Sequence, residues 1–227
     1  MIGIFDSGDG GLFALRELRR RSPNCDILFF ADRKNAPYGT KSKNELIRVT
    51  TKGILKLLRA GADKVLIACC TASAHHAYLP TIIKEKSIPI IYPTSSEAAL
   101  ATHNGRIGVI ATKTTVSSMA FTKALSEFDS VNSVFESELQ ELVFKVDDGA
   151  RDGLINYRQK LWLYQRLLHF KEKKIDTLIL GCTHFGHLER EISYLMPNIR
   201  IINSAKEGAK EIIKYSSPFG RGETVYL

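Results

Sequence analysis

Short apolar runs alternate with amphipathic stretches along most of this chain. The first run, Ile2–Phe5, is followed by a glycine-rich loop and by residues 12–18, whose apolar positions recur with helical spacing. Further apolar runs at 27–30, 65–68 and 88–92 alternate with predicted helices at about 42–60, 72–86 and 96–102. Strands that alternate with helices are typical of a parallel sheet covered on both faces, so the pattern predicts an α/β fold.

The pattern starts again near residue 106, because Ile2–Ser7 and Ile107–Thr112 align residue for residue. After 131–149, where we find no clear pattern, predicted helices at about 154–171, 188–196 and 205–215 alternate with apolar runs at 175–180 and 199–202. We therefore predict two pseudo-symmetric, doubly wound parallel-sheet lobes, formed by 1–95 with 205–227 and by 96–204. Ligands bind outside the carboxyl ends of such strands, so the active site is expected in the cleft between the lobes.

Cys69 and Cys182 end corresponding apolar runs, and in each case an aspartate, Asp63 or Asp176, stands six positions earlier. Two thiols across a cleft could form a disulfide, bind a metal ion or act as an acid–base pair. The chain has no Cys-x-x-Cys pair, and its histidines lack the spacing of a zinc site, so acid–base chemistry fits best. We expect following helices and His184 to lower the pKa of these thiols. Cys25 is expected to be a core residue or a partly exposed residue without a role.

Composition narrows the classes of protein. The 227 residues include no apolar run near the ~20 needed to span a membrane, and the start of the chain does not resemble a signal peptide. Four cysteines without such a signal indicate free thiols in the cytoplasm. The net charge is +8, but acids interrupt the basic residues, so an acidic small molecule is a better expected partner than nucleic acid.

Five segments in order carry a family resemblance. Phe5–Leu12 resembles the motif FDSGxGG with a following leucine, and Ala68–Ala74 resembles ACNTASA with one difference. Asp32 with 37–39, Ile107–Ser118 and Gly181–Phe185 are similar to three further motifs of the same family. On these motifs the sequence resembles the glutamate racemases of the aspartate/glutamate racemase superfamily, over nearly the whole chain.

The resemblance implies a cytoplasmic isomerase that interconverts L- and D-glutamate without a cofactor or metal ion, and that supplies D-glutamate for peptidoglycan, and so for cell wall and cell shape. It implies that Cys69 and Cys182 are the two bases and that Asp6 and His184 assist proton transfer. The residues that it implies for substrate binding are Asp6, Ser7, Tyr38, Gly39, Cys70, Thr71, Thr112, Thr115, Thr183 and His184.

Two departures from the family pattern leave alternatives open. Cys70 stands where the family has asparagine, and a lost hydrogen bond to a carboxylate costs about 1.5–3 kcal/mol, or more than tenfold in affinity. The family's glutamate in the unclear stretch has two candidates here, Glu138 and Glu141. The alternatives are a racemase of another acidic amino acid, such as aspartate, or a weakened, racemase-like binding protein. The sequence leaves a homodimer open.

Overall fold

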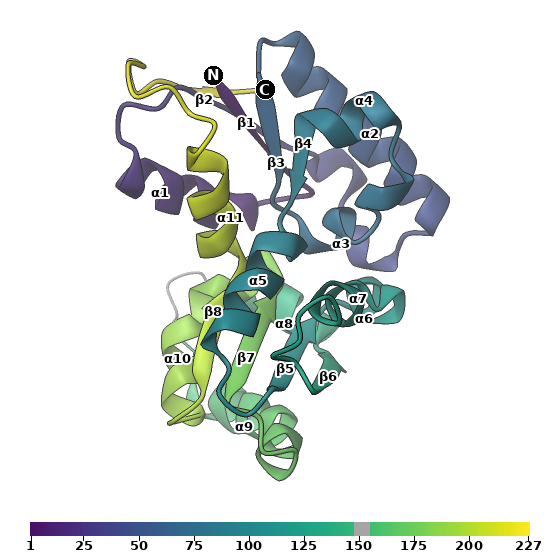
Figure 1. The fold of residues 1–227 in the computed structure, drawn as a ribbon, viewed down its shortest axis with the longest axis vertical. Helices are drawn as coiled ribbons and strands as arrows, with labels where there is room; N and C mark the ends of the chain where they lie inside the picture. Colours follow the sequence, from purple (N-terminus) through teal and green to yellow (C-terminus); the bar gives the residue numbers. More distant parts are fainter. Residues whose placement is uncertain (148–154) are drawn as a thin grey trace.

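The computed structural model describes residues 1–147 and 155–227, and in it the chain forms two parallel sheets, one above the other in Figure 1. The upper sheet has the strand order β4 (Ser87–Pro89), β3 (Lys64–Ile67), β1 (Ile2–Asp6), β2 (Ile27–Ala31), β9 (Thr224–Tyr226). The lower sheet has the order β6 (Ser133–Glu138), β5 (Arg106–Ala111), β7 (Thr177–Gly181), β8 (Arg200–Asn203). We call the two sheets with their helices the first and the second lobe. The predicted α/β fold with two parallel-sheet lobes is confirmed.

Helices cover both faces of the first sheet because alternate strand residues point to opposite sides. Ile4 packs with Leu18 on one face, whereas Phe5 packs with Val49 and Ile54 on the other. The helices and short helical turns of this lobe are α1 (Gly11–Arg21), η1 (Arg33–Asn35), η2 (Tyr38–Thr40), α2 (Lys43–Arg59), α3 (Cys70–Ser73), η3 (His76–Tyr78) and α4 (Thr81–Lys86).

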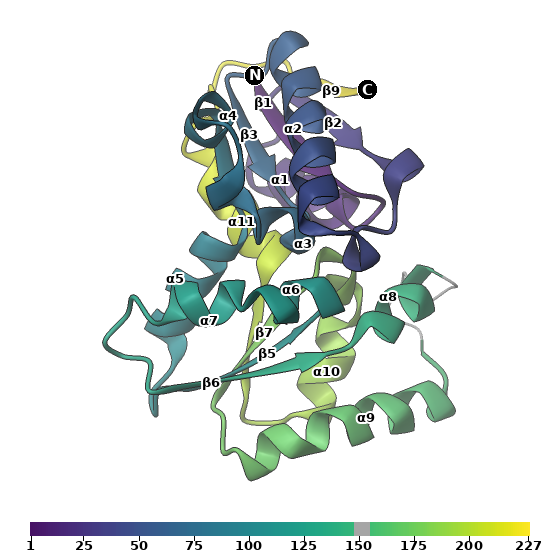
Figure 2. The ribbon, with the colours of Figure 1, turned by 90° about the vertical axis from the view of Figure 1, so that its right-hand side faces the viewer.

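The second sheet is covered in the same way. Ile110 packs with Leu167 and Phe170 on one face, whereas Val109 packs with Phe121 on the other. The helices that follow α4 are α5 (Ile91–Ala101), α6 (Lys113–Ser118), α7 (Ala120–Leu125), α8 (Gln140–Asp147), α9 (Tyr157–Glu172), η5 (Thr183–Leu188), α10 (Glu189–Leu195) and α11 (Ser204–Ile213). Figure 2 shows α9 along the outer side of this lobe.

Helices α5 and α11 join the lobes. α11 packs against α1 and β3 of the first lobe and also against α5, while α5 packs against α7 and β7 of the second. One cluster of buried side chains therefore continues from Ile2 and Leu66 in the first lobe to Val109 and Ile179 in the second. The division of the sequence between the lobes at 95/96 and 204/205 stays a prediction.

The two sheets repeat one topology. In both, the strand that begins the lobe lies between its two successors, and the order β4-β3-β1-β2 corresponds to β8-β7-β5-β6. The register repeats as well, since Ile2 pairs with Lys64 and Ile107 pairs with Thr177. A residue placed five positions after either partner therefore lies at an equivalent place beyond its sheet.

Several element predictions were wrong in detail. The single helix expected over 72–86 is divided into α3, η3 and α4, because Pro80 cannot continue a helix and instead begins the next one. Helix α5 begins at Ile91, inside the run expected to be a strand up to residue 92. The stretch without a clear pattern contains β6 and α8, and its last residues, like the expected helix start near residue 154, lie outside the described residues.

Candidate active site

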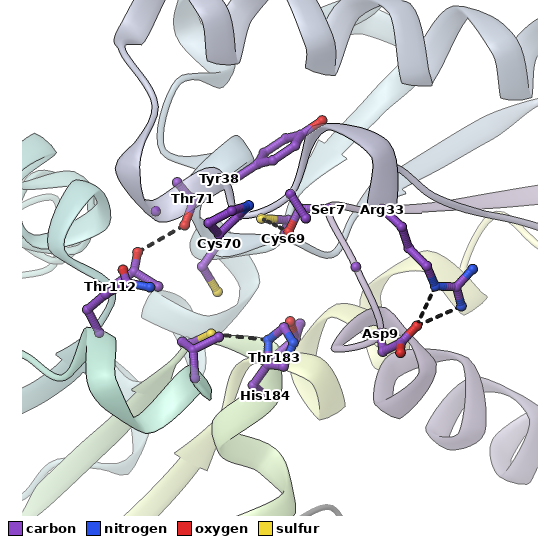
Figure 3. A pocket seen from close by; sticks show the side chains of 17 residues that line it. Ser7, Asp9, Arg33, Tyr38, Cys69, Cys70, Thr71, Thr112, Thr183 and His184 are labelled. Atoms are coloured by element: carbon purple, nitrogen blue, oxygen red, sulfur yellow. Dashed lines mark hydrogen bonds and ion pairs between the residues drawn. The ribbon is translucent and has the colours of Figure 1, made fainter. Parts of the chain in front are cut away.

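A cavity of about 320 Å³ lies between the lobes, beyond the carboxyl ends of the central strands (Figure 3). Ten of the twelve predicted site residues line it: Ser7, Tyr38, Gly39, Cys69, Cys70, Thr71, Thr112, Cys182, Thr183 and His184. The other two, Asp6 and Thr115, are fully buried behind this lining. The structure therefore brings residues from distant parts of the sequence to one place.

Cys69 and Cys182 occupy equivalent positions in the two lobes. Each stands five positions after the strand residue that pairs with Ile2 or Ile107, so the shared register carries both to the same end of their sheets. Both are free thiols, exposed to 6% and 7%. Two thiols from opposite lobes thus line one cavity.

The aspartates that precede these cysteines lie at the other ends of their strands. Asp63 accepts a hydrogen bond from the N-terminal ammonium group at 2.6 Å. Asp176 accepts bonds from Thr102 Oγ1 and from the backbone N–H groups of His103 and Asn104, each at 2.7 Å. The repeated aspartate therefore belongs to the turns that begin the strands and not to the cavity.

Cys69 has a hydroxyl neighbour. Ser7 Oγ donates a hydrogen bond to its Sγ at 3.3 Å. Burial, and after it the nearby charge of Asp6, raise the pKa of the Cys69 thiol to about 11 against the opposing effect of the Ser7 hydrogen bond. The expectation of a lowered thiol pKa was therefore wrong for Cys69, because burial outweighs the neighbouring helix.

Cys182 has an imidazole neighbour. His184 Nδ1 lies 3.7 Å from its Sγ. Burial again raises the pKa of the Cys182 thiol. Since imidazole can both take up and release a proton near neutral pH, His184 differs chemically from the Ser7 hydroxyl at the other thiol.

Asp6 lies at the end of β1 and has no exposed surface. Its carboxylate accepts a hydrogen bond from the Gly8 N–H at 2.8 Å and one from Thr183 Oγ1 at 3.3 Å. Burial raises the pKa of Asp6 to about 7, although both bonds favour the charged form. The direct contact between Asp6 and a substrate stays a prediction. The Asp6 carboxylate stands behind Ser7 and Thr183, where it holds the loop of one lobe against a hydroxyl of the other.

Three threonine hydroxyls meet where the lobes face each other. Thr71 Oγ1 lies 2.9 Å from Thr112 Oγ1 and 3.3 Å from Thr115 Oγ1, and the latter two are 2.8 Å apart. Thr112 also caps the N-terminus of α6 by accepting a bond from the Thr115 N–H. Thr71 and Thr112 therefore present hydroxyl groups to the cavity with Thr115 behind them.

Tyr38 and Gly39 form another part of the wall. The Tyr38 hydroxyl donates to Asp32 Oδ2 at 2.7 Å, which holds the ring in place. Thr114 Oγ1 of the second lobe donates to the Gly39 carbonyl at 2.5 Å. This turn of the first lobe is thus tied to helix α6 of the second.

Family membership follows from a match that covers most of the chain. The model of the Asp/Glu/Hydantoin racemase family matches residues 15–212. The chain belongs to this racemase family. The family named by the motifs in the sequence is thereby confirmed.

Three relatives show how close the likeness is. Glutamate racemase of Aquifex aeolicus (strain VF5) is 35% identical over 224 residues, which is 97% of this chain and 85% of the relative. The crystal structure of glutamate racemase isoform RacE1 from Bacillus anthracis has a TM-score of 0.86 and 30% identity, covering 100% of this chain and 86% of that one. Glutamate racemase from Francisella tularensis in complex with D-glutamate has a TM-score of 0.83 and 27% identity, covering 94% and 80%.

This racemase-family chain has a third thiol in its cavity. Cys70 is 2% exposed, and its Sγ donates to Ser204 Oγ at 3.5 Å. Burial raises the pKa of this thiol above the ordinary range as well. Cys70 therefore offers the cavity a neutral, weak hydrogen-bonding group.

Sequence reasoning missed several cavity residues of this family member. Asp9 and Arg33 line the mouth as an ion pair, and Gln140 and Val143 of α8 line the wall. Neither Glu138 nor Glu141, the two candidates for the family's glutamate, is among the described residues that line the cavity. The position of Asp9 in the glycine-rich loop beside Ser7 was the available signal, whereas nothing in the pattern of 131–149 singled out α8.

The described residues also include Cys25, which is 1% exposed in the core as predicted. Within residues 1–147 and 155–227, no three His, Cys, Asp or Glu side chains form a group that could hold a metal ion. None of the helices in those ranges has both the length and the apolar character needed to cross a membrane.

Proposed function

We propose that this protein is a glutamate racemase that moves the proton at Cα between its two thiols, Cys69 and Cys182. The observation that carries the proposal is their equivalent placement in two lobes, with both side chains lining one cavity. A base on one side of a carbon and an acid on the other are what inversion requires. The glutamate racemases named above, similar over nearly the whole chain, support glutamate as the substrate.

In the proposed reaction one cysteine acts as a thiolate and the other as a thiol. The thiolate removes the Cα proton, and the opposite thiol donates its proton to the other face of the carbon. Each turnover leaves the protonation of the pair reversed, so the enzyme is then ready for the other enantiomer. No group beyond the two thiols is needed to balance the protons.

Because the pKa of the Cys69 thiol is raised, the bound substrate must help this thiol to ionise. A thiol with a pKa of about 11 is ionised in about one molecule in ten thousand at pH 7. A positive charge nearby lowers a thiol pKa, and the ammonium group of an amino acid supplies one. The proposal therefore includes activation of the base by the substrate itself, with the Ser7 hydrogen bond stabilising the thiolate form of Cys69.

His184 and Asp6 are proposed to assist proton transfer in different ways. His184 lies beside Cys182, where it can exchange a proton with that thiol. Asp6 acts from behind the lining, through Gly8 and Thr183. The cavity hydroxyls of Thr71, Thr112 and Thr183 are proposed to hold a carboxylate.

The biological setting is proposed from the family. We infer that the protein works in the cytoplasm without a cofactor and provides D-glutamate for peptidoglycan, and so for cell wall and cell shape.

Circular dichroism of L-glutamate incubated with the purified protein tests the proposal. The optical signal should decay to zero as an equal mixture of enantiomers forms. The matched control is the double variant Cys69→Ser/Cys182→Ser, which should leave the signal unchanged. A folded parent that leaves L-glutamate unchanged would exclude the proposed function.

Cys70 supports one alternative, a racemase that prefers another acidic amino acid such as aspartate. Its thiol lines the cavity where the family motif has an amide, so one strong hydrogen bond to a carboxylate is replaced by a weak one. Deuterium exchange at Cα across a panel of amino acids, read by NMR, compares the substrates. Cys70→Asn should lower KM for glutamate more than tenfold; an unchanged KM would contradict this account of Cys70.

A further inference from the structure

One ion pair stands at the mouth of the cavity. Arg33 follows β2 and begins η1, and Asp9 lies in the loop between β1 and α1. Arg33 Nη2 and Nε lie 2.6 Å and 2.8 Å from the same carboxylate oxygen, Asp9 Oδ1. Figure 3 shows this pair on one side of the cavity and the hydroxyls of Thr71 and Thr112 on the opposite side.

Arg33 and Asp9 are the charged lysine, arginine, aspartate or glutamate residues among the described residues that line the cavity. Among the described residues that line the cavity, Arg33 is the only lysine or arginine and Asp9 the only aspartate or glutamate. The remaining wall consists of hydroxyls, thiols, one amide, one imidazole and apolar or backbone groups. Among the described lining residues, Arg33 is therefore the only arginine or lysine that an anion in the cavity can contact.

The ion pair is also accessible to solvent, so another carboxylate can exchange with Asp9 as the partner of Arg33. The Arg33 side chain is 64% exposed and that of Asp9 28%, so water screens their attraction. A guanidinium group has five N–H donors and binds carboxylates in a planar, two-pronged geometry. A carboxylate at the mouth can therefore share or replace Asp9 as the partner of Arg33 without first exposing a buried charge.

Resting on the proposed function, we propose that Arg33 binds the anionic side chain of the substrate at the cavity mouth and that Asp9 weakens this binding by competing for the same guanidinium group. Arg33 is then a specificity-determining residue that favours acidic over neutral amino acids. Asp9 keeps Arg33 at the mouth in the empty site and limits how tightly an anion is held.

Under this proposal, removal of Arg33 and removal of Asp9 change KM for glutamate in opposite directions. Arg33→Gln removes the cation from the mouth, so KM for glutamate should rise about tenfold, with a much smaller change in kcat. Asp9→Asn removes the competitor, so KM should fall about twofold to threefold. An ion pair that only braces two loops would behave otherwise, because losing either partner would then shift KM in the same direction.

The experiment measures KM and kcat for L-glutamate in the parent, Arg33→Gln, Asp9→Asn and Arg33→Lys at low and high salt. Lys34→Gln is the matched control, since it removes one exposed positive charge next to Arg33 from a side chain that does not line the cavity. It should leave KM unchanged. Added salt should raise KM of the parent more than that of Arg33→Gln, and Arg33→Lys should recover part of the lost affinity.

Two outcomes would overturn the proposal. KM shifts of the same sign in Arg33→Gln and Asp9→Asn, or none, in a parent that racemises glutamate, would overturn this inference while leaving the proposed function intact. A parent that neither racemises glutamate nor binds it in calorimetry would overturn the proposed function and this inference together.

Discussion

The two halves of the cavity share a backbone plan but differ in the groups around each thiol. Cys69 and Cys182 are placed by the same strand register, yet Cys69 has the Ser7 hydroxyl beside it and Cys182 has His184. Asp6 ends β1, whereas Ala111 ends the corresponding strand β5. The repeated topology thus places the two thiols equivalently, whereas the side chains beside each thiol differ in their chemistry.

Removal of either thiol tests the shared part of this comparison and should have the largest effect. Cys69→Ser and Cys182→Ser should each slow racemisation by about 10²–10⁴-fold, because a serine hydroxyl is a far weaker acid than a thiol. Circular dichroism gives the rate, and Cα deuterium exchange shows which enantiomer each variant still ionises. Cys25→Ser, which alters a buried thiol outside the cavity, should keep the parent rate within about twofold. Full activity in either single variant would rule out the two-thiol mechanism.

Asp6, which has no acidic counterpart in the second lobe, should make stability depend on pH. Its pKa is raised from 3.8 to about 7, so between these values the folded protein keeps a proton that the unfolded chain has lost. The free energy of unfolding should therefore fall as pH rises from about 4 to 7, by up to about 4 kcal/mol from this group. Asp6→Asn should remove that slope in urea titrations at several pH values.

Asp26 provides a control, because its effect on the pH dependence of the free energy of unfolding has the opposite sign. Asp26 is partly exposed, and hydrogen bonds from backbone N–H groups hold the pKa of its carboxyl below the ordinary value. Its contribution is present at neutral pH and is lost as pH falls, so Asp26→Asn should flatten the acid side of the curve instead. Identical pH profiles for the parent and Asp6→Asn would contradict the raised pKa of Asp6.

The unlike neighbours of the two thiols can be compared directly. His184→Gln should lower kcat about tenfold to a hundredfold, since it removes a proton acceptor, and Ser7→Ala about tenfold, since it removes one hydrogen bond to a thiolate. The equilibrium constant of racemisation is one, so kcat/KM must fall equally in both directions. The asymmetry is therefore measured in the isotope effects with α-deuterated L- and D-glutamate. Equal isotope effects in both variants would mean that the neighbours are interchangeable.

The threonine cluster between the lobes should give the smallest effect. Thr112→Val removes both the cap of α6 and a hydroxyl that faces Thr71, and should cost about 1–2 kcal/mol of stability with a raised KM. Ser42→Ala is the control, because Ser42 caps α2 and does not line the cavity. It should cost about 1 kcal/mol without changing KM. Thermal unfolding and steady-state kinetics separate the two, and an unchanged KM in Thr112→Val would exclude its hydroxyl from substrate binding.

The parts of the fold set by local pattern were predictable from the sequence. The apolar runs Ile2–Phe5 and Val65–Ala68 contain the buried residues of β1 and β3, and their repetition at 107–111 and 175–180 indicated the second lobe. The cysteines could be found because each ends such a run. The active-site motifs were recognisable for the same reason, since they occupy the loops that directly follow strands.

Properties that depend on tertiary contacts were not predictable. The pairing of Asp9 with Arg33 joins residues 24 positions apart through two loops whose shapes no periodicity describes. Gln140 reaches the cavity only because α8 packs against η5, which follows Cys182. The thiol pKa was misjudged because burial, which the sequence does not report, outweighs the effect of a following helix.

Strand β9 has a consequence for the order in which the molecule can assemble. The edge of β2 pairs with Thr224–Tyr226, whereas the strands of the second sheet all come from residues between 106 and 203. During synthesis all strands of the second sheet therefore leave the ribosome before β9, the strand that pairs with the outer edge of β2. Until β9 emerges, the edge of β2 exposes unpaired backbone N–H and C=O groups that can pair with another extended chain, which favours aggregation.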